Sequence, residues 1–202
     1  MTEVHDRLRE DEHLRPLVEE HGELTLEPAD DFYQRFVTSI LRQQVSMASA
    51  AATRERLFDA VEVTPEGVLD ADVDVLRDAG LSQAKARYVR NVAEAFLERG
   101  YSREHFEGMS HDEVVDELTT ITGVGEWTAH MQLMFALGRE DVFPVGDLGI
   151  RKGMRNVVDP DLTRAEMVDY SERWSPYRTY ASLYLWRAQD DVSEDVPGAV
   201  QD

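Results

Sequence analysis

Apolar residues recur at helical spacing along most of this chain. In residues 32–41 the apolar side chains follow steps of three or four residues, as on one face of a helix. Residues 83–96, 110–121 and 163–174 repeat the pattern. The alternation typical of half-buried strands is almost absent. The pattern therefore predicts an all-α protein.

Small polar residues precede these runs and mark helix starts, because their side chains accept hydrogen bonds from first-turn amides. We expect N-caps at Asp30, Ser46, Thr64, Ser82, Ser110, Asp147 and Thr163. Glu113 and Glu166 each stand three residues after such a cap, which completes a capping box. Residues 1–29 predict a single helix that ends before Gly22, and the last helix is expected to start at Ser175.

A tight glycine turn separates two predicted helices. Gly123 and Gly125 flank Val124, and glycine tolerates the positive φ that a short reversal needs. The helix after the turn is expected from about Glu126 to Leu137. Its first-turn amides lack partners within the helix and lie at the positive end of the helix dipole. They can hold a phosphate without a basic side chain, so the turn is a candidate anchor for a DNA backbone.

Two glutamines interrupt the apolar pattern between two helices. Gln43 and Gln44 lie in the segment from Leu41 to Ser46. Taken alone, they indicate a polar turn with no role of its own.

Composition excludes several kinds of site. The 202 residues contain no cysteine, which excludes disulfides and a cysteine-ligated iron–sulfur cluster. The six histidines are scattered, without the spacing of a zinc site. No apolar stretch reaches the length of a membrane span, and the N-terminus is charged. We expect one compact unit or two small lobes, located in the cytoplasm and without membrane contact.

The net charge of −20 argues against nucleic-acid binding, which usually relies on basic surfaces. However, the chain has two lysines against nineteen arginines, and its acidic residues are spread over its whole length. This composition is typical of a protein adapted to molar salt. At such salt the Debye length is about 3 Å, so the net charge hardly reaches a ligand. Binding would then depend on short-range hydrogen bonds, stacking and wedge insertion.

Four segments together resemble one family. They are GLSQAKA at 80–86, GVGEWTA at 123–129, VFPVGDLGIRK at 142–152 and WSPYRTYASLYLW at 174–186. The set resembles the helix-hairpin-helix superfamily of DNA glycosylases, and in detail its 3-methyladenine DNA glycosylase II (AlkA-like) branch. The resemblance covers roughly residues 30–188 and leaves no room for the β-rich N-terminal domain of longer members.

The resemblance implies an all-α fold of two lobes with the active-site cleft between them. We expect a single domain over residues 1–190, with one lobe of about 36–138 and the other formed by 1–35 and 139–190. Residues 191–202 are expected to form an acidic disordered tail.

The resemblance also implies roles for individual residues. It makes Asp147 the catalytic carboxylate. The implied base pocket is lined by Trp127, Trp186, Met131, Tyr184 and Leu148. The implied DNA contacts are Gln44, as a wedge pushed into the duplex, with Gly123, Val124, Gly125, Trp127, Thr128 and Lys85. The backbone carbonyls implied to hold Na⁺ or K⁺ are those of Thr119, Ile121 and Val124, and no other cofactor is required.

The implied reaction is hydrolysis of the N-glycosidic bond of an alkylated purine that has been flipped out of the duplex. Lysine-dependent members of the superfamily carry a lysine where this chain has Trp127, so water is the implied nucleophile. An alkylated purine is cationic, attracts indole faces and leaves as a neutral base. Asp147 alone can then stabilise the developing sugar cation and orient or deprotonate the water.

We therefore predict a monofunctional DNA glycosylase that initiates base excision repair, acts as a monomer and binds double-stranded DNA with damaged bases. The alternative is a non-catalytic helix-hairpin-helix module for damaged or distorted DNA, in which both tryptophans belong to the core and Asp147 is only an N-cap. A helical protein-interaction domain would leave the combination of motifs unexplained. A glycosylase-lyase is disfavoured by Trp127, and Lys152 is the residue to check for it.

Overall fold

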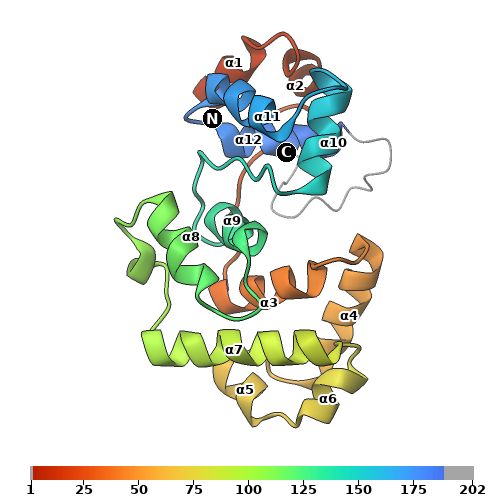
Figure 1. Ribbon diagram of the computed structural model, residues 1–202, viewed down its shortest axis with the longest axis vertical. Coiled ribbons are helices and arrows are strands. Elements are labelled where there is room, and N and C mark those ends of the chain that lie inside the picture. The colour runs from red at the N-terminus through yellow and green to blue at the C-terminus, as the bar shows by residue number, and fades with distance from the viewer. Residues whose placement is uncertain (1, 189–202) are drawn as a thin grey trace. The chain divides into compact units, whose positions relative to one another are not determined.

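The computed structural model describes residues 2–188, and their regular structure is helical (Figure 1). The helices are α1 (Thr2–Arg9), α2 (Arg15–His21), α3 (Phe32–Arg42), α4 (Met47–Ala60), α5 (Pro65–Asp70), α6 (Val73–Asp78), α7 (Gln83–Arg99), η1 (Glu104–Phe106), α8 (His111–Thr119), α9 (Glu126–Phe135), α10 (Leu148–Val157), α11 (Arg164–Ser171), η2 (Glu172–Trp174) and α12 (Arg178–Arg187). The predicted all-α class is confirmed. The tail predicted at 191–202 lies outside the described residues. Within residues 2–188, no helix is long and apolar enough to cross a membrane.

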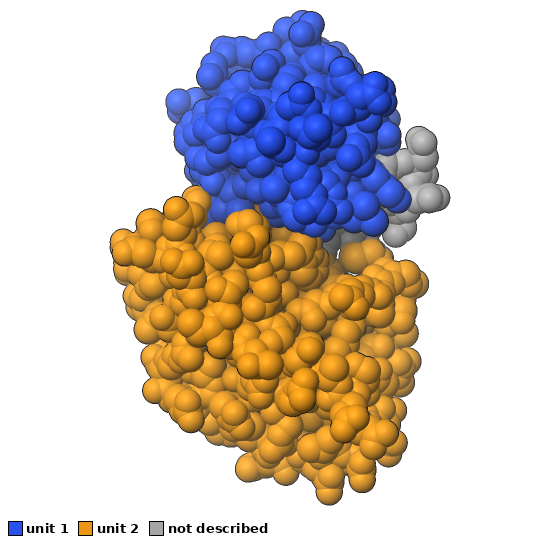
Figure 2. All heavy atoms as spheres, viewed as in Figure 1, with its two compact units in different colours: residues 1–28, 138–202 blue, residues 29–137 orange. Residues whose placement is uncertain are grey.

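The chain divides into two compact units (Figure 2). Unit 1 consists of Met1–Pro28 and Gly138–Asp202, and unit 2 consists of Ala29–Leu137. We expected a lobe boundary near residue 35, but α3 begins at Phe32 and lies whole within unit 2.

Unit 2 is built around α7, a helix of 17 residues. It contacts α3 on one side and the short helices α5 and α6 on the other (Figure 1). The core beside it is aromatic, since the ring of Phe96 meets Phe32 and Phe36 edge to face, with centroids 5.1 and 5.8 Å apart. Helices α8 and α9 pack against each other, and α9 also packs on α3. This arrangement brings the α8–α9 hairpin to the same core as the turn after α3.

In unit 1, α12 packs on α10 and on α2. A Cβ added at Gly153 of α10 would stand 2.2 Å from the carbonyl oxygen of Leu185, so the two helices approach closely there. Tyr184 is fully buried, and its hydroxyl donates to the carbonyl oxygen of Gly22 at 2.7 Å. These contacts fix α12, whose last turn carries Trp186.

The predicted helix starts are confirmed at six positions. Side chains cap helices at Ser46, Thr64, Ser82, Ser110, Asp147 and Thr163, and both capping boxes are present. Other expectations about the helix bounds are wrong. The cap of α3 is Asp31 rather than Asp30. Residues 1–29 form two helices, because the Asp11 carboxylate accepts from the amides of His13 and Leu14 and holds a turn between them.

Candidate active site and DNA-binding elements

Asp147 stands at the start of α10 in unit 1. Its Oδ1 accepts from the Ile150 amide at 3.0 Å and from the indole Nε1–H of Trp186 at 2.9 Å. Asp147 and Trp186 are both half-buried. Because a helix amide and an indole hold the same oxygen, the carboxylate is fixed in rotation as well as in position. The sequence predicted the cap, and the resemblance implied that Trp186 lines the base pocket. Neither showed this hydrogen bond.

The loop before Asp147 is anchored on the start of α12. Arg178 pairs with Asp141 through two hydrogen bonds, Nε to Oδ1 at 2.7 Å and Nη2 to Oδ2 at 2.9 Å. Burial raises the pKa of Asp141, but the hydrogen bonds from Arg178 and Ser175 outweigh it and hold that pKa below its ordinary value. The Ser175 hydroxyl donates a hydrogen bond to Oδ2 of Asp141. The helix α12 begins at Arg178, so the expected start at Ser175 is wrong. Both ends of α12 thus touch the segment that carries Asp147.

The first turn of α10 closes the same loop. Nη1 of Arg151 donates to the carbonyl oxygens of Val145 and Gly146 at 3.0 and 2.6 Å. Leu148, next to Asp147, is exposed over 57% of its surface. An apolar side chain is therefore displayed beside a fixed carboxylate, and the place of Leu148 in a base pocket stays a prediction.

The hairpin of unit 2 differs from expectation at one glycine. Gly123 has a φ of +103°, and a Cβ there would stand 2.2 Å from Cγ of Tyr88, so glycine is required. Gly125 has a φ of −103°, and a Cβ there would meet nothing within 4 Å. The expectation that both glycines serve a positive φ is wrong for Gly125. Its missing side chain instead leaves open space over the first amides of α9.

The turn between α3 and α4 is tied to the hairpin by Gln43. Its Nε2 donates to the carbonyl oxygen of Gly123 at 2.9 Å and to Oγ1 of Thr128 at 3.0 Å. The neighbouring Gln44 is exposed and has a φ of +58°, a backbone conformation that residues other than glycine rarely adopt. Gln43 therefore holds the turn, while Gln44 is displayed at it. Sequence reasoning missed the role of Gln43, because its partners are 80 and 85 residues away.

Lys85 has a partner inside unit 2. Its Nζ donates to the carbonyl oxygen of Leu41 at 2.6 Å, and burial lowers the pKa of this lysine. Leu41 lies in the last turn of α3, where a positive charge is favourable. Lys85 thus stabilises the end of α3, and its contact with a phosphate stays a prediction.

The predicted base pocket draws residues from both units, and its assembly stays a prediction. Trp127 is half-buried, and Met131 is buried. Tyr184 has no exposed surface and bonds to the backbone of unit 1 at Gly22 and Leu24. We therefore leave Tyr184 out of the proposed pocket.

The predicted cation site uses carbonyls around the hairpin. The Ile121 carbonyl oxygen accepts from the Val124 amide at 2.9 Å, which leaves it a second lone pair for an ion. Residues 2–188 contain no cluster of three or more His, Cys, Asp or Glu side chains that could hold a metal. A site made of carbonyls suits Na⁺ or K⁺ and not zinc.

Comparison with known proteins gives a consistent result. The family described as "HhH-GPD superfamily base excision DNA repair protein" matches residues 37–174. DNA-3-methyladenine glycosylase 1 of Schizosaccharomyces pombe is 33% identical over 163 residues, 77% of this chain and 71% of that protein. The putative DNA-3-methyladenine glycosylase YfjP of Bacillus subtilis is 30% identical over 186 residues, 87% of this chain and 65% of that protein. The structure of Schizosaccharomyces pombe Mag1, a 3-methyladenine DNA glycosylase in complex with abasic DNA, has a TM-score of 0.86 and 30% identity, covering 95% of this chain and 100% of that chain.

Proposed function

Because the chain belongs to the HhH-GPD superfamily of base excision DNA repair proteins, we propose that it is a monofunctional DNA glycosylase that hydrolyses the N-glycosidic bond of alkylated purines. The observation that carries the proposal is the carboxylate of Asp147, held on one oxygen by the Ile150 amide and the Trp186 indole. Relatives that share the fold and about a third of the residues are named 3-methyladenine DNA glycosylases.

The chemistry follows from this carboxylate. Loss of the base leaves positive charge on the sugar, and a pre-oriented carboxylate stabilises that charge without rearranging during the reaction. The same group can orient the attacking water. An alkylated purine departs as a neutral base, so no second carboxylate is required. The half-buried Trp127 and Trp186 supply the indole faces that favour a cationic ring.

The hairpin and the turn after α3 supply the DNA contacts. The first amides of α9 can hold a phosphate, and the open space at Gly125 lets the DNA backbone come close. A flipped base leaves a gap in the duplex. The exposed Gln44 is suited to fill it, because Gln43 fixes the turn from which it projects.

We also propose that Na⁺ or K⁺ binds the carbonyls of Thr119, Ile121 and Val124. Such an ion would stiffen the hairpin and add positive charge near the bound phosphate.

The proposed activity is tested with methylated duplex DNA in molar KCl, with free bases measured by mass spectrometry. We expect the wild type to release alkylated purines, and Asp147→Asn to release far less while remaining folded, since asparagine is also a good N-cap. Asp72→Asn, at the N-cap of α6, is the matched control and should match the wild type. DNA binding without base release by the wild type would instead support the non-catalytic module.

The monofunctional assignment is tested by borohydride reduction during the reaction. A lysine that attacks the sugar would be trapped as a covalent adduct. We expect no adduct. An adduct that disappears in Lys152→Gln would show a lyase activity carried by the exposed Lys152 of α10.

A further inference from the structure

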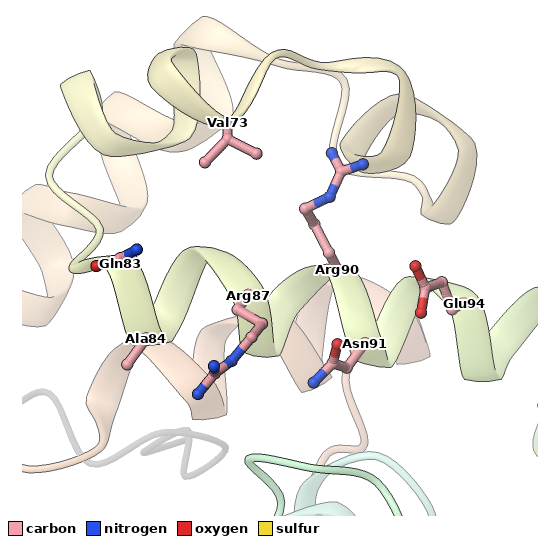
Figure 3. Close-up of a pocket in the computed structure, with 7 residues that line it drawn as sticks. All are labelled: Val73, Gln83, Ala84, Arg87, Arg90, Asn91 and Glu94. Carbon is pink, nitrogen blue, oxygen red and sulfur yellow. The ribbon is translucent and has the colours of Figure 1, made fainter.

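A hollow of about 530 Å³ runs along α7 in unit 2 (Figure 3). Its lining includes Val73 of α6 and, from α7, Gln83, Arg87, Arg90, Asn91 and Glu94. We call this hollow the α7 groove. The lining carries two arginines and one carboxylate, in a chain whose net charge is −20.

The two arginines of the groove have different roles. Nη1 of Arg90 donates to the carbonyl oxygens of Val68 and Ala71 at 3.1 and 3.0 Å, so it holds the connection between α5 and α6. Arg87 is exposed and forms no ion pair with any residue in the range 2–188. Its guanidinium carbon lies 5.6 Å from the ring centroid of Tyr88. Arg87 is therefore the group that the groove offers to a ligand.

The groove adjoins the hairpin. Nδ2 of Asn91 donates to the carbonyl oxygen of Thr122 at 2.9 Å, and Gly123 lies against the ring of Tyr88. Arg87 and Asn91 extend from the same side of α7 (Figure 3). Four residues of helix separate them by about 6 Å along the axis. A chain-like ligand held at the hairpin can thus continue directly to Arg87.

We propose that the α7 groove binds a backbone phosphate of the DNA held by the hairpin, with Arg87 as its ligand. This inference rests on the proposed function, because it needs DNA at the hairpin. A guanidinium can bind a phosphate through two hydrogen bonds. The first amides of α7, beside Gln83, add the positive end of a helix dipole. Salt weakens both interactions, but a guanidinium in direct contact with a phosphate is screened less than charges that lie more than a Debye length apart.

The test measures the Kd of the full chain for a fluorescein-labelled duplex with an abasic-site analogue, by fluorescence anisotropy across a KCl series. We expect Arg87→Ala to weaken binding about threefold to tenfold and to flatten the plot of log Kd against log[KCl] by about 0.9, the loss of one phosphate contact. Arg87→Lys keeps the charge, and its Kd should lie between those of the wild type and Arg87→Ala. Because Arg87 is exposed, both variants should melt as the wild type does.

A second pair of variants separates the groove from net charge. Glu94→Gln removes the carboxylate of the lining and should tighten DNA binding about twofold to threefold. Glu98→Gln makes the same charge change one turn further along α7, outside the lining, and should leave Kd unchanged. Equal tightening by both variants would overturn the groove as a site.

Base release by the same proteins distinguishes this inference from the proposed activity. If the wild type releases no base but Arg87→Ala still weakens DNA binding, the phosphate site in the groove is supported and the glycosylase activity is refuted. If the wild type releases bases and Arg87→Ala binds DNA as the wild type does, the phosphate site is refuted and the glycosylase activity is supported. Competition of inorganic phosphate with DNA in the wild type, absent in Arg87→Ala, would support the site. Phosphate binding at Arg87 with no effect on DNA would overturn it.

Discussion

Trp186 positions the proposed catalytic carboxylate through one hydrogen bond, and that bond can be removed without removing the ring. Trp186→Phe keeps an aromatic face but loses the donor to Oδ1 of Asp147. A hydrogen bond to a charged group contributes about 1.5–3 kcal/mol. If it acts in the transition state, the single-turnover rate of base release should fall roughly tenfold to a hundredfold.

The matched control is Trp174→Phe, also in unit 1. Trp174 donates its indole N–H to Oδ2 of Asp11 at 3.1 Å and is fully buried. This variant should melt at a lower temperature, yet the folded protein should release bases at the wild-type rate. An equal loss of rate in both variants would mean that Trp186 acts through general stability and not through Asp147.

Gln44 combines a strained backbone with an exposed side chain. Replacing it with glycine should therefore increase stability but slow base flipping. A side chain at a φ of +58° costs about 1–2 kcal/mol relative to the ordinary helical region. Gln44→Gly should therefore raise the free energy of unfolding by about 1 kcal/mol, but it removes the proposed wedge and should slow base flipping. Urea unfolding gives the first quantity, and 2-aminopurine fluorescence beside the lesion gives the second.

Gln44→Ala is the control for that prediction, because it removes the wedge and keeps the strain. It should slow flipping as much as glycine does, with no gain in stability. Wild-type flipping in both variants would show that Gln44 is not inserted into the duplex.

Single residues could be predicted where the signal is local. The caps at Ser110 and Thr163 depend on partners three residues away, and both are confirmed. The bonds of Gln43 to the hairpin and of Trp186 to Asp147 join positions 80 and 39 residues apart. No local pattern encodes such a pair. The resemblance placed Trp186 near the reaction, but its bonding partner required the packing of α12 on α10.

At the scale of elements, the hairpin separates a glycine needed by the fold from one available to a ligand. Gly123→Ala should lower the free energy of unfolding by about 2 kcal/mol or more, because it meets both a positive φ and the ring of Tyr88. Gly125→Ala should change stability by less than about 1 kcal/mol, since its φ is ordinary and the space is open.

DNA binding should separate the same two variants. A methyl group at Gly125 stands over the first amides of α9, so Gly125→Ala should weaken the Kd for an abasic duplex at least tenfold in a protein of normal stability. Calorimetric melting and anisotropy on the two variants provide the comparison. Wild-type affinity in Gly125→Ala would show that no phosphate approaches this backbone.

Elements were predictable where the apolar spacing was regular and a cap stood before it, as for α7, α8 and α11. The N-terminal segment was not, because its few apolar residues did not show that the single helix expected to end before Gly22 is instead the pair α1 and α2. What divides the pair is the Asp11 turn, a competition between side-chain and backbone acceptors that apolar spacing does not show. The φ of Gly125 likewise depends on the hairpin as a whole.

For the whole molecule, fold class and family were predictable because several weak motifs agreed, each at its expected distance from the others. The net charge of −20 taken alone argues against DNA binding. Together with the scarcity of lysine, it instead indicates a protein adapted to molar salt. The α7 groove had no sequence signature, since its lining is assembled from α6 and the exposed side of α7. Charge and function are compatible here if the DNA contacts are local and the surrounding charge is screened.

The charge itself predicts how stability depends on salt. With 41 acidic and 21 basic side chains, the folded chain repels itself at low ionic strength, and screening relieves that repulsion. The melting temperature should therefore rise by about 5–10 °C between dilute buffer and molar KCl, which corresponds to about 2–3 kcal/mol for a chain of this size.

An equal rise in choline chloride would assign the effect to screening. A larger rise in KCl would assign the excess to K⁺ bound by the native hairpin, because an ion that binds only the folded state stabilises it by mass action. A melting temperature that stays constant or falls with salt would contradict the interpretation of the acidic composition as salt adaptation.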